Sequence, residues 1–229
     1  MLSPFMHGEV TQVEPIAERM RRIRISGPEL RDLDWVPGMH IRLRVCDPRR
    51  PGTWLRGFLR TYSIWDYSAE GHLDMCILDH PAAGPGALWS RRAHVGDVAV
   101  FMRPEGRFVL RQDAPYHLFT GDETAAVAFG AMLRALSPSA IVHGVILADR
   151  PGDQLPLARS DRLTWVYRPD ELPDAVLSLD FPGEPGVAYV AGEARTCQAV
   201  RGHLVNERGW SRRDVVVKPF WAPGRRGMD

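Results

Sequence analysis

The chain has few cysteines, no long apolar run and almost no net charge. Its three cysteines, Cys46, Cys76 and Cys197, lack the Cys-x-x-Cys spacing of a structural zinc site or an iron–sulfur cluster, so we expect no metal centre and three buried thiols. The longest apolar stretches, 141–148 and 187–191, are too short to cross a bilayer. A formal net charge of +1 gives no basic surface for nucleic acid. We therefore expect neither a membrane span nor a nucleic-acid partner.

Length and the first residues narrow the class further. The 229 residues, of which 45% are hydrophobic, suffice for two ordinary domains or one large one with a substantial core. Residues 1–10 include Pro4, His7 and Glu9 and lack the charged-then-apolar progression of a secretory signal. We expect a globular, cytoplasmic protein that acts as a monomer.

The first half of the chain has the residue pattern of a small β-barrel. Short, often alternating apolar segments separated by Gly and Pro predict strands at 22–26, 39–46, 62–65, 73–78 and 98–102. One helix is expected at 84–92. The pattern predicts an antiparallel six-stranded barrel in a domain of residues 1–113.

The second half alternates strands with helices. Strands are predicted at 117–120, 141–148, 163–167, 187–191 and 214–217, and helices at 123–136, 171–178 and 193–207. The last helix has apolar residues on one face, namely Ala194, Cys197, Val200, Leu204 and Val205. This alternation predicts an α/β domain with a parallel sheet in residues 114–229.

Two motifs in the first half suit a flavin dinucleotide. In Arg60-Thr61-Tyr62-Ser63, the arginine offers a planar fork for a pyrophosphate and the tyrosine a ring face for a fused heterocycle. Further along, a Gly-Pro-Gly opens a helix whose amides can receive the same phosphates. Each motif alone is weak, because Gly-Pro pairs mostly mark ordinary turns, but their order supports one site. The candidate flavin-binding residues are Arg60, Thr61, Tyr62, Ser63, His80, Gly84, Pro85, Gly86, Ala87 and Trp89.

Two further motifs lie where strands of the predicted parallel sheet end and helices begin. That edge of an open α/β sheet is where nucleotides bind. Alternatively, their acids are simply favourable in first helical turns. Two such motifs after a flavin-like barrel favour a nicotinamide cofactor. The candidate residues are Gly121, Asp122, Glu123, Thr124, Ala191, Gly192 and Glu193.

The order of these elements resembles the ferredoxin–NADP reductase superfamily and, within it, the siderophore-interacting protein family. Members of that family carry Arg-x-Tyr-Ser/Thr, His-Gly/Pro-x-x-Gly-Pro-Ala-x-x-Trp, Gly-Asp-Glu-Thr-Ala, Ala-Gly-Glu and Gly-Tyr-Trp. The corresponding segments here are 60–63, 80–89, 121–125, 191–193 and 219–221. The resemblance thus covers nearly the whole chain.

The resemblance implies roles for these residues. Tyr62 would pack on the isoalloxazine, Arg60 would pair with the diphosphate and Ser63 would bond near the flavin ring. Segment 84–89 would hold the diphosphate and the adenosine end. His80 would lie beside the cofactor, or equally be a strand-end histidine bonded to a local carbonyl.

For the second half, the resemblance implies that Asp122, Thr124 and Glu193 border the nicotinamide pocket. Trp221 would close over the flavin or the substrate. Two departures from the family pattern stand out. Trp65 replaces an arginine that often follows the tyrosine motif, and Pro219-Phe220 replaces Gly-Tyr, which stiffens the backbone.

The implied activity is that of an FAD-dependent NAD(P)H:ferric-siderophore oxidoreductase. The flavin carries the hard chemistry, so no catalytic acid–base pair is expected among the side chains. Arginines such as Arg56, Arg107 or Arg195 could attract an anionic ferric siderophore. The choice between NADH and NADPH depends on a positive group near the adenosine 2′-phosphate, where Asp149 offers an acid and Arg150 a base. We favour NADPH, because Arg150 and Arg195 could both reach that phosphate. The alternatives are another flavin or ferredoxin-type reductase of the superfamily, a non-catalytic flavin- or siderophore-binding protein, and a two-domain protein with coincidental turns and caps.

Overall fold

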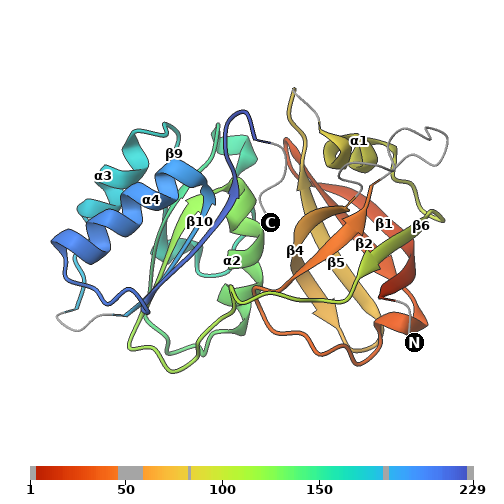
Figure 1. The fold of residues 1–229 in the computed structure, drawn as a ribbon, viewed down its shortest axis with the longest axis horizontal. Helices are drawn as coiled ribbons and strands as arrows, with labels where there is room; N and C mark the ends of the chain where they lie inside the picture. The colour runs from red at the N-terminus through yellow and green to blue at the C-terminus, as the bar shows by residue number, and fades with distance from the viewer. Residues whose placement is uncertain (1–3, 46–58, 82–83, 183–185, 226–229) are drawn as a thin grey trace. The chain divides into compact units, whose positions relative to one another are not determined.

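The chain folds into two compact units, Met1–Arg107 and Phe108–Asp229 (Figure 1). The computed structural model describes residues 4–45, 59–81, 84–182 and 186–225. Two sequence candidates, Cys46 and Arg56, lie outside the described residues. In the described part of the chain, no helix has both the length and the apolar character needed to span a bilayer.

The first unit is a closed barrel of antiparallel strands. Its strands follow one another around the barrel in the order β1-β2-β5-β4-β3-β6, and a short 3-10 helix η1 (Pro28–Leu30) follows β2. The predicted barrel is confirmed. The strands are β1 (Phe5–Ala17), β2 (Met20–Ser26), β3 (His40–Arg44), β4 (Leu59–Ser68), β5 (His72–Leu78) and β6 (Val98–Met102).

The longest strand of the barrel, β1, is the one that the sequence pattern did not predict. Gly8 and Pro15 interrupt its alternation, although Met6 and Val10 are buried in the core. A Cβ on Gly8 would lie 2.4 Å from Cγ2 of Ile25. Glycine here therefore marks a close approach of β1 to β2 rather than a turn.

The barrel core contains the inward-facing apolar residues of all six strands. Ile23 and Ile25 of β2 alternate with arginines, which is the pattern of a strand buried on one face. Helix α1 (Pro85–Arg92) lies near one end of the barrel, at the top in Figure 1, and its Trp89 packs partly against this core.

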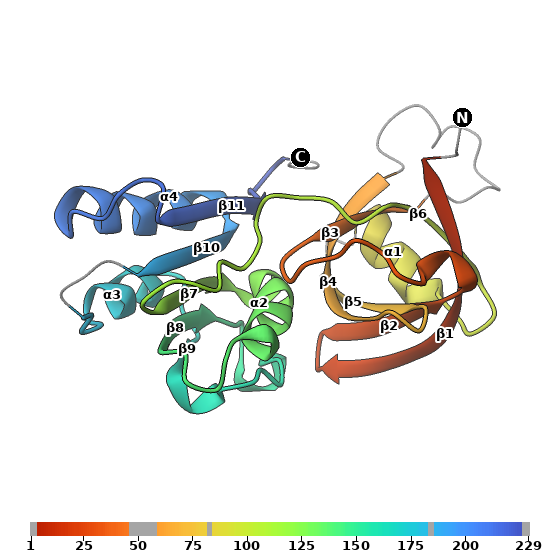
Figure 2. The same ribbon diagram turned by 90° about the horizontal axis from the view of Figure 1, so that it is seen from below.

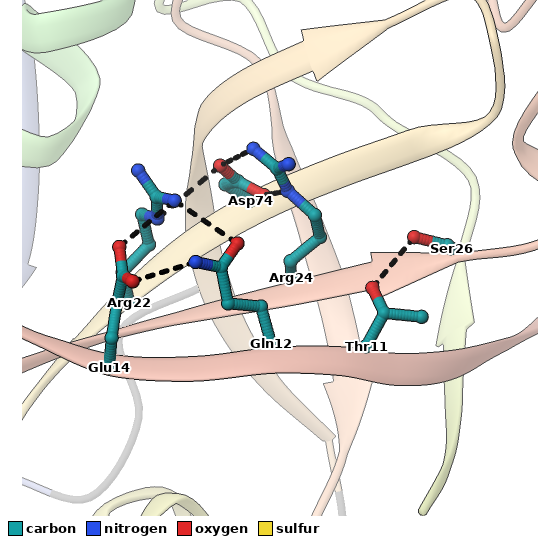
Figure 3. A network of polar contacts seen from close by, with 7 residues as sticks. All are labelled: Thr11, Gln12, Glu14, Arg22, Arg24, Ser26 and Asp74. Atoms are coloured by element: carbon teal, nitrogen blue, oxygen red, sulfur yellow. Dashed lines mark hydrogen bonds and ion pairs between the residues drawn. The ribbon is translucent and has the colours of Figure 1, made fainter. Parts of the chain in front are cut away.

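A charged network lies on the outer face of three neighbouring strands (Figure 3). Asp74 of β5 is fully buried and accepts two hydrogen bonds from Arg24 of β2, at 2.7 and 2.9 Å. Arg22 reaches Asp74 at 3.6 Å and pairs with Glu14 of β1 at 2.9 Å. The bond with Asp74 raises the pKa of Arg24. Because Asp74 is buried and its bonds come from neighbouring strands, this network helps hold β1, β2 and β5 together.

The second unit is a parallel sheet with helices on both faces, as predicted (Figures 1 and 2). The strand order is β11-β10-β7-β8-β9, and every pairing is parallel. Helix α2 lies on one face, and α3 and α4 lie on the other. The elements are β7 (His117–Asp122), α2 (Glu123–Ala135), β8 (Val142–Leu147), η3 (Pro151–Asp153), η4 (Ser160–Arg162), β9 (Leu163–Val166), α3 (Glu171–Leu177), β10 (Val187–Glu193), α4 (Ala194–Gly202), η5 (His203–Glu207) and β11 (Val215–Trp221).

The last predicted helix changes its winding part-way. The sequence predicted one helix over 193–207, but α4 ends at Gly202 and η5 is π-helical. The amide of Arg208 bonds the carbonyl of His203, five residues earlier, at 3.1 Å. Cys197, Val200 and Leu204 nevertheless stay buried, so the predicted apolar face survives the change of winding.

Candidate cofactor sites

The Arg60-Thr61-Tyr62-Ser63 motif lies on β4, opposite β3, and all four residues are half-buried. Alternate residues of a strand share a face, so Arg60 and Tyr62 lie on the side of the core residue Ile64. Tyr62 packs partly against that core. The motif therefore offers its arginine and its aromatic ring on one surface.

The two flavin motifs meet at the first turn of α1. A Cβ on Gly86 would lie 1.8 Å from the hydroxyl of Tyr62 and 3.6 Å from Cγ of Arg60. Only glycine leaves room for the tyrosine here. Burial raises the pKa of Tyr62 while the charge of Arg60 opposes the rise, so the phenol stays neutral at physiological pH. Arg60, Tyr62 and Gly86 are thus brought together, although they are far apart in the sequence.

Helix α1 begins without a side-chain cap. Its N-cap is Gly84, in extended conformation, followed by Pro85, and its first turn has no acidic residue. A helix N-terminus carries a partial positive charge and amide groups that favour an anion. This start therefore suits a phosphate group.

Side-chain hydrogen bonds attach the other end of α1 to the barrel. Arg91 donates to both carboxylate oxygens of Asp79, at 2.6–3.0 Å, and to the carbonyl of His80 at 3.2 Å. Arg21 of β2 donates to the carbonyl of Ser90 at 2.5 Å. The bond with Arg91 lowers the pKa of Asp79. No local sequence pattern predicts these bonds as a set, although an arginine in a last helical turn is a usable signal.

Asp122 is the centre of the candidate site in the second unit. It is 5% exposed and is the N-cap of α2: its Oδ1 accepts bonds from the amides of Thr124 and Ala125, at 2.9 and 3.3 Å. The Thr124 hydroxyl donates to the same oxygen. Its other oxygen, Oδ2, accepts from the amide of Glu193 at 3.0 Å and from the indole N–H of Trp221 at 2.7 Å. Burial raises the pKa of Asp122, and these bonds oppose the rise.

The glycines of these two motifs, Gly121 and Gly192, allow other parts of the second unit to approach the backbone closely. A Cβ on Gly121 would lie 2.1 Å from the carbonyl oxygen of Ala191. Gly192 has φ +112°, and a Cβ there would lie 2.5 Å from Oδ2 of Asp122. Both glycines are needed for the close approach of β7 and β10, whatever ligand binds nearby.

Glu193 caps α4 as Asp122 caps α2. Its carboxylate accepts from the amide and hydroxyl of Thr196, at 2.8 and 3.1 Å. Burial acts to raise the pKa of Glu193, but backbone bonds from Arg195 and Thr196 outweigh it and the pKa is lowered. Glu123 is mostly buried in the first turn of α2. The structure thus gives the acids the capping role weighed as the alternative, and their contact with a nicotinamide stays a prediction.

Trp65 and Phe220, which depart from the family pattern, and Trp221, which matches it, occupy different environments. Trp65 is 4% exposed and lies where β4 shifts register against β5. Phe220 packs edge-on against Phe108, with ring centroids 6.3 Å apart. Trp221 is 44% exposed at the end of β11. The candidate siderophore arginines that the structure describes, Arg107 and Arg195, are exposed.

Comparison with known proteins decides the family. Residues 9–108 match the model of the siderophore-interacting FAD-binding domain, and residues 114–224 match that of the siderophore-interacting protein. The chain belongs to the siderophore-interacting protein family. The resemblance read from the sequence is confirmed.

Among curated proteins, the chain is 26% identical over 226 residues to the mycobactin import ATP-binding/permease protein IrtA of Mycobacterium tuberculosis, covering 94% of the chain and 26% of IrtA. It is 26% identical over 176 residues to the ferric vibriobactin reductase ViuB of Vibrio cholerae, covering 72% of the chain and 65% of ViuB. The chain therefore spans a quarter to two thirds of the length of these relatives.

Among solved structures, the siderophore-interacting protein SipS of Aeromonas hydrophila has the same fold. The TM-score is 0.83, the identity is 24%, and the match covers 97% of this chain and 93% of SipS. This likeness concerns the architecture of barrel and parallel sheet.

Proposed function

We propose that this member of the family is an FAD-dependent NAD(P)H oxidoreductase that reduces the iron of a ferric siderophore to Fe(II). The observation that carries the proposal is the meeting of Arg60, Tyr62 and the uncapped start of α1 within the siderophore-interacting FAD-binding domain. The relative ViuB of Vibrio cholerae is a ferric vibriobactin reductase, which supports the choice of acceptor. Reduction weakens the hold of hard oxygen ligands on iron, which releases the metal.

The residues present fit FAD. Helix α1 begins at Gly84, which has no side chain to cap it, and its first turn contains no acidic residue, so its amides suit a phosphate; Arg60, whose Cγ lies beside this turn, has a guanidinium suited to a diphosphate. Tyr62 supplies an aromatic ring with a neutral phenol. When bound, FAD would supply hydride acceptance and single-electron release. The protein would orient the cofactor, and residues 1–113 would form this domain.

The donor site is proposed for residues 114–229, at the carboxyl edge of the sheet. Asp122 and Glu193 place carboxylates at the starts of α2 and α4, so this edge disfavours further phosphate there and suits the uncharged parts of a dinucleotide. Arg150 and Arg195, both exposed, favour NADPH through its 2′-phosphate. A lower Michaelis constant for NADPH than for NADH would support this preference, and equal constants would remove it.

An anaerobic titration tests the proposal. FAD-loaded protein is mixed with NADPH or NADH while the flavin absorbance is followed, and a ferric siderophore is then added with a ferrous trap. We expect bleaching by the nicotinamide and recovery of the bands on adding the chelate, with Fe(II) in the trap. Flavin that binds but does not bleach would favour a non-catalytic binding protein. Bleaching without recovery would favour a reductase with another acceptor.

A further inference from the structure

Three parallel strands of the second unit end at one carboxylate. Strand β7 ends at Asp122, β10 at Glu193 and β11 at Trp221. The Glu193 amide and the Trp221 indole reach the same oxygen, Oδ2, from residues 71 and 99 positions away in the sequence. Asp122 therefore joins the ends of three strands as well as capping a helix.

The two carboxylate oxygens of Asp122 accept hydrogen bonds from different elements. Oδ1 faces the first turn of α2 and serves as the helix cap. Oδ2 faces β10 and β11, and Gly192, with no side chain, leaves room for it. The amides and the indole that surround the carboxylate are donors only, so an ionised carboxylate satisfies them and an amide nitrogen in the place of Oδ2 would not.

The indole of Trp221 is held at its polar edge while nearly half of its surface stays exposed. A tryptophan fixed in this way presents a planar apolar face, which suits stacking with a flat heterocycle. Without the bond to Asp122, the side chain at the end of an outer strand would be free to change rotamer.

We propose that Asp122 is a positioning residue that holds the Trp221 ring, through its indole N–H, as a wall of the nicotinamide subsite. This inference rests on the proposed function, because it assumes that a nicotinamide binds at this edge. It assigns to Asp122 an effect on donor binding that acts through Trp221.

The substitution Asp122→Asn separates the two sets of hydrogen bonds. Asparagine is as good a helix cap as aspartate, so its oxygen can replace Oδ1 at α2. Its NH₂ group then faces the Glu193 amide and the Trp221 indole, both donors, and the bond to the indole is lost. Trp221→Phe is the companion variant: it keeps a six-membered aromatic ring and removes the N–H together with the five-membered ring that carries it.

The contact itself can be observed without any cofactor. The chain has seven tryptophans, and ¹⁵N labelling gives one indole resonance for each. The resonance missing from Trp221→Phe identifies Trp221. In Asp122→Asn we expect that resonance to move upfield and its proton to exchange faster with water, while the other six stay in place. An unmoved Trp221 resonance would overturn the proposal.

Kinetics of flavin reduction by NADPH test the role. A charge-assisted hydrogen bond is worth roughly a tenfold change in an equilibrium constant, so we expect the KM of each variant to rise about tenfold with kcat within twofold. The double variant should be no worse than either single one, because both remove the same contact. The proposal would be overturned if the rises in KM of the two single variants add up in the double variant, or if Trp221→Phe keeps the wild-type KM. The KM of Trp221→Phe can be measured even if Asp122→Asn does not fold. If NADPH does not reduce the flavin of the wild-type protein, the proposed function is refuted. The indole resonance would still show whether Asp122 bonds Trp221.

Discussion

Helix α1 of the first unit and helices α2 and α4 of the second unit begin in opposite ways. In the second unit, α2 and α4 begin at Asp122 and Glu193, whose carboxylates accept bonds from first-turn amides. In the first unit, α1 begins at Gly84 with no side-chain cap. The partial positive charge of a helix start is therefore met by a carboxylate at α2 and α4, whereas at α1 we propose that a phosphate meets it. A glycine at a strand-to-helix junction thus signals an anion site only where no acid follows it.

The largest expected effect comes from breaking the self-capped side with Gly192→Ala. Alanine would have to keep the positive φ of Gly192, which strains a residue with a side chain, and its Cβ would collide with Oδ2 of Asp122. We therefore expect a loss of about 3–4 kcal/mol in the free energy of unfolding. Urea denaturation measures the loss.

A matched control is Gly209→Ala. Gly209 also has positive φ, +70°, but a Cβ there would meet no atom within 4 Å in the part of the chain that the structure describes. It should cost only about 1 kcal/mol. Equal losses in both variants would show that backbone strain alone, and not the Asp122 contact, requires Gly192.

The second prediction gives α1 a cap of its own. In Gly84→Asp, the extended backbone at the N-cap allows the new carboxylate to accept first-turn amides, and among the described residues none lies within 4 Å of the new Cβ. We expect the free energy of unfolding to rise by about 1 kcal/mol, because the helix gains a cap. We expect FAD affinity to fall by roughly 30- to 100-fold, because the new carboxylate occupies the helix start and repels the phosphates of FAD. Fluorescence titration of the apoprotein with FAD measures the affinity. Gly84→Ser, a neutral cap, should lose much less, and equal losses would argue against a phosphate at this helix start.

The smallest effect concerns pH. His117 is buried between Phe119 and Tyr189, and neither ring nitrogen has a partner in the described part of the chain. Burial first, and then the charge of Arg159, lowers its pKa, so the unfolded chain binds the proton more readily. The stabilising contribution is therefore complete above the unfolded pKa of about 6.5 and is lost as the pH falls below it.

We expect the free energy of unfolding to fall by about 1 kcal/mol from this residue between pH 7.5 and 5.5. Urea denaturation at several pH values measures it. His117→Phe should flatten the dependence by that amount, and an equally steep curve in the variant would assign the effect to other groups.

The sequence predicted the order of elements well because local patterns encode it. Alternation predicted β2, β5 and β6, and the change of rhythm after residue 113 predicted the parallel sheet. Strand β1 was missed because its glycine serves a packing contact with Ile25 that no local pattern reveals. The end of α4 was also missed, since a π-helical turn differs from an α-helical one by one hydrogen-bond step.

The candidate sites divide in the same way. Motif order predicted which segments belong together, and the meeting of Tyr62 with Gly86 agrees with the placement of both in one site. The bond between Asp122 and Trp221 could not be predicted, because it joins residues 99 positions apart through a side-chain orientation. The capping bonds of Asp122 and Glu193 were foreseeable from their positions, and the sequence alone could not rank capping against ligand binding.

Pro219 has a consequence for association with other chains. Strand β11 is an outermost strand of the sheet, and outer strands carry backbone groups that can recruit a strand from another molecule. Proline has no N–H to offer, and the lone lysine, Lys218, precedes it with a charge. The proline that replaces a glycine of the family pattern therefore leaves this outer strand with one backbone donor fewer, whereas the described strands of the first unit close into a barrel.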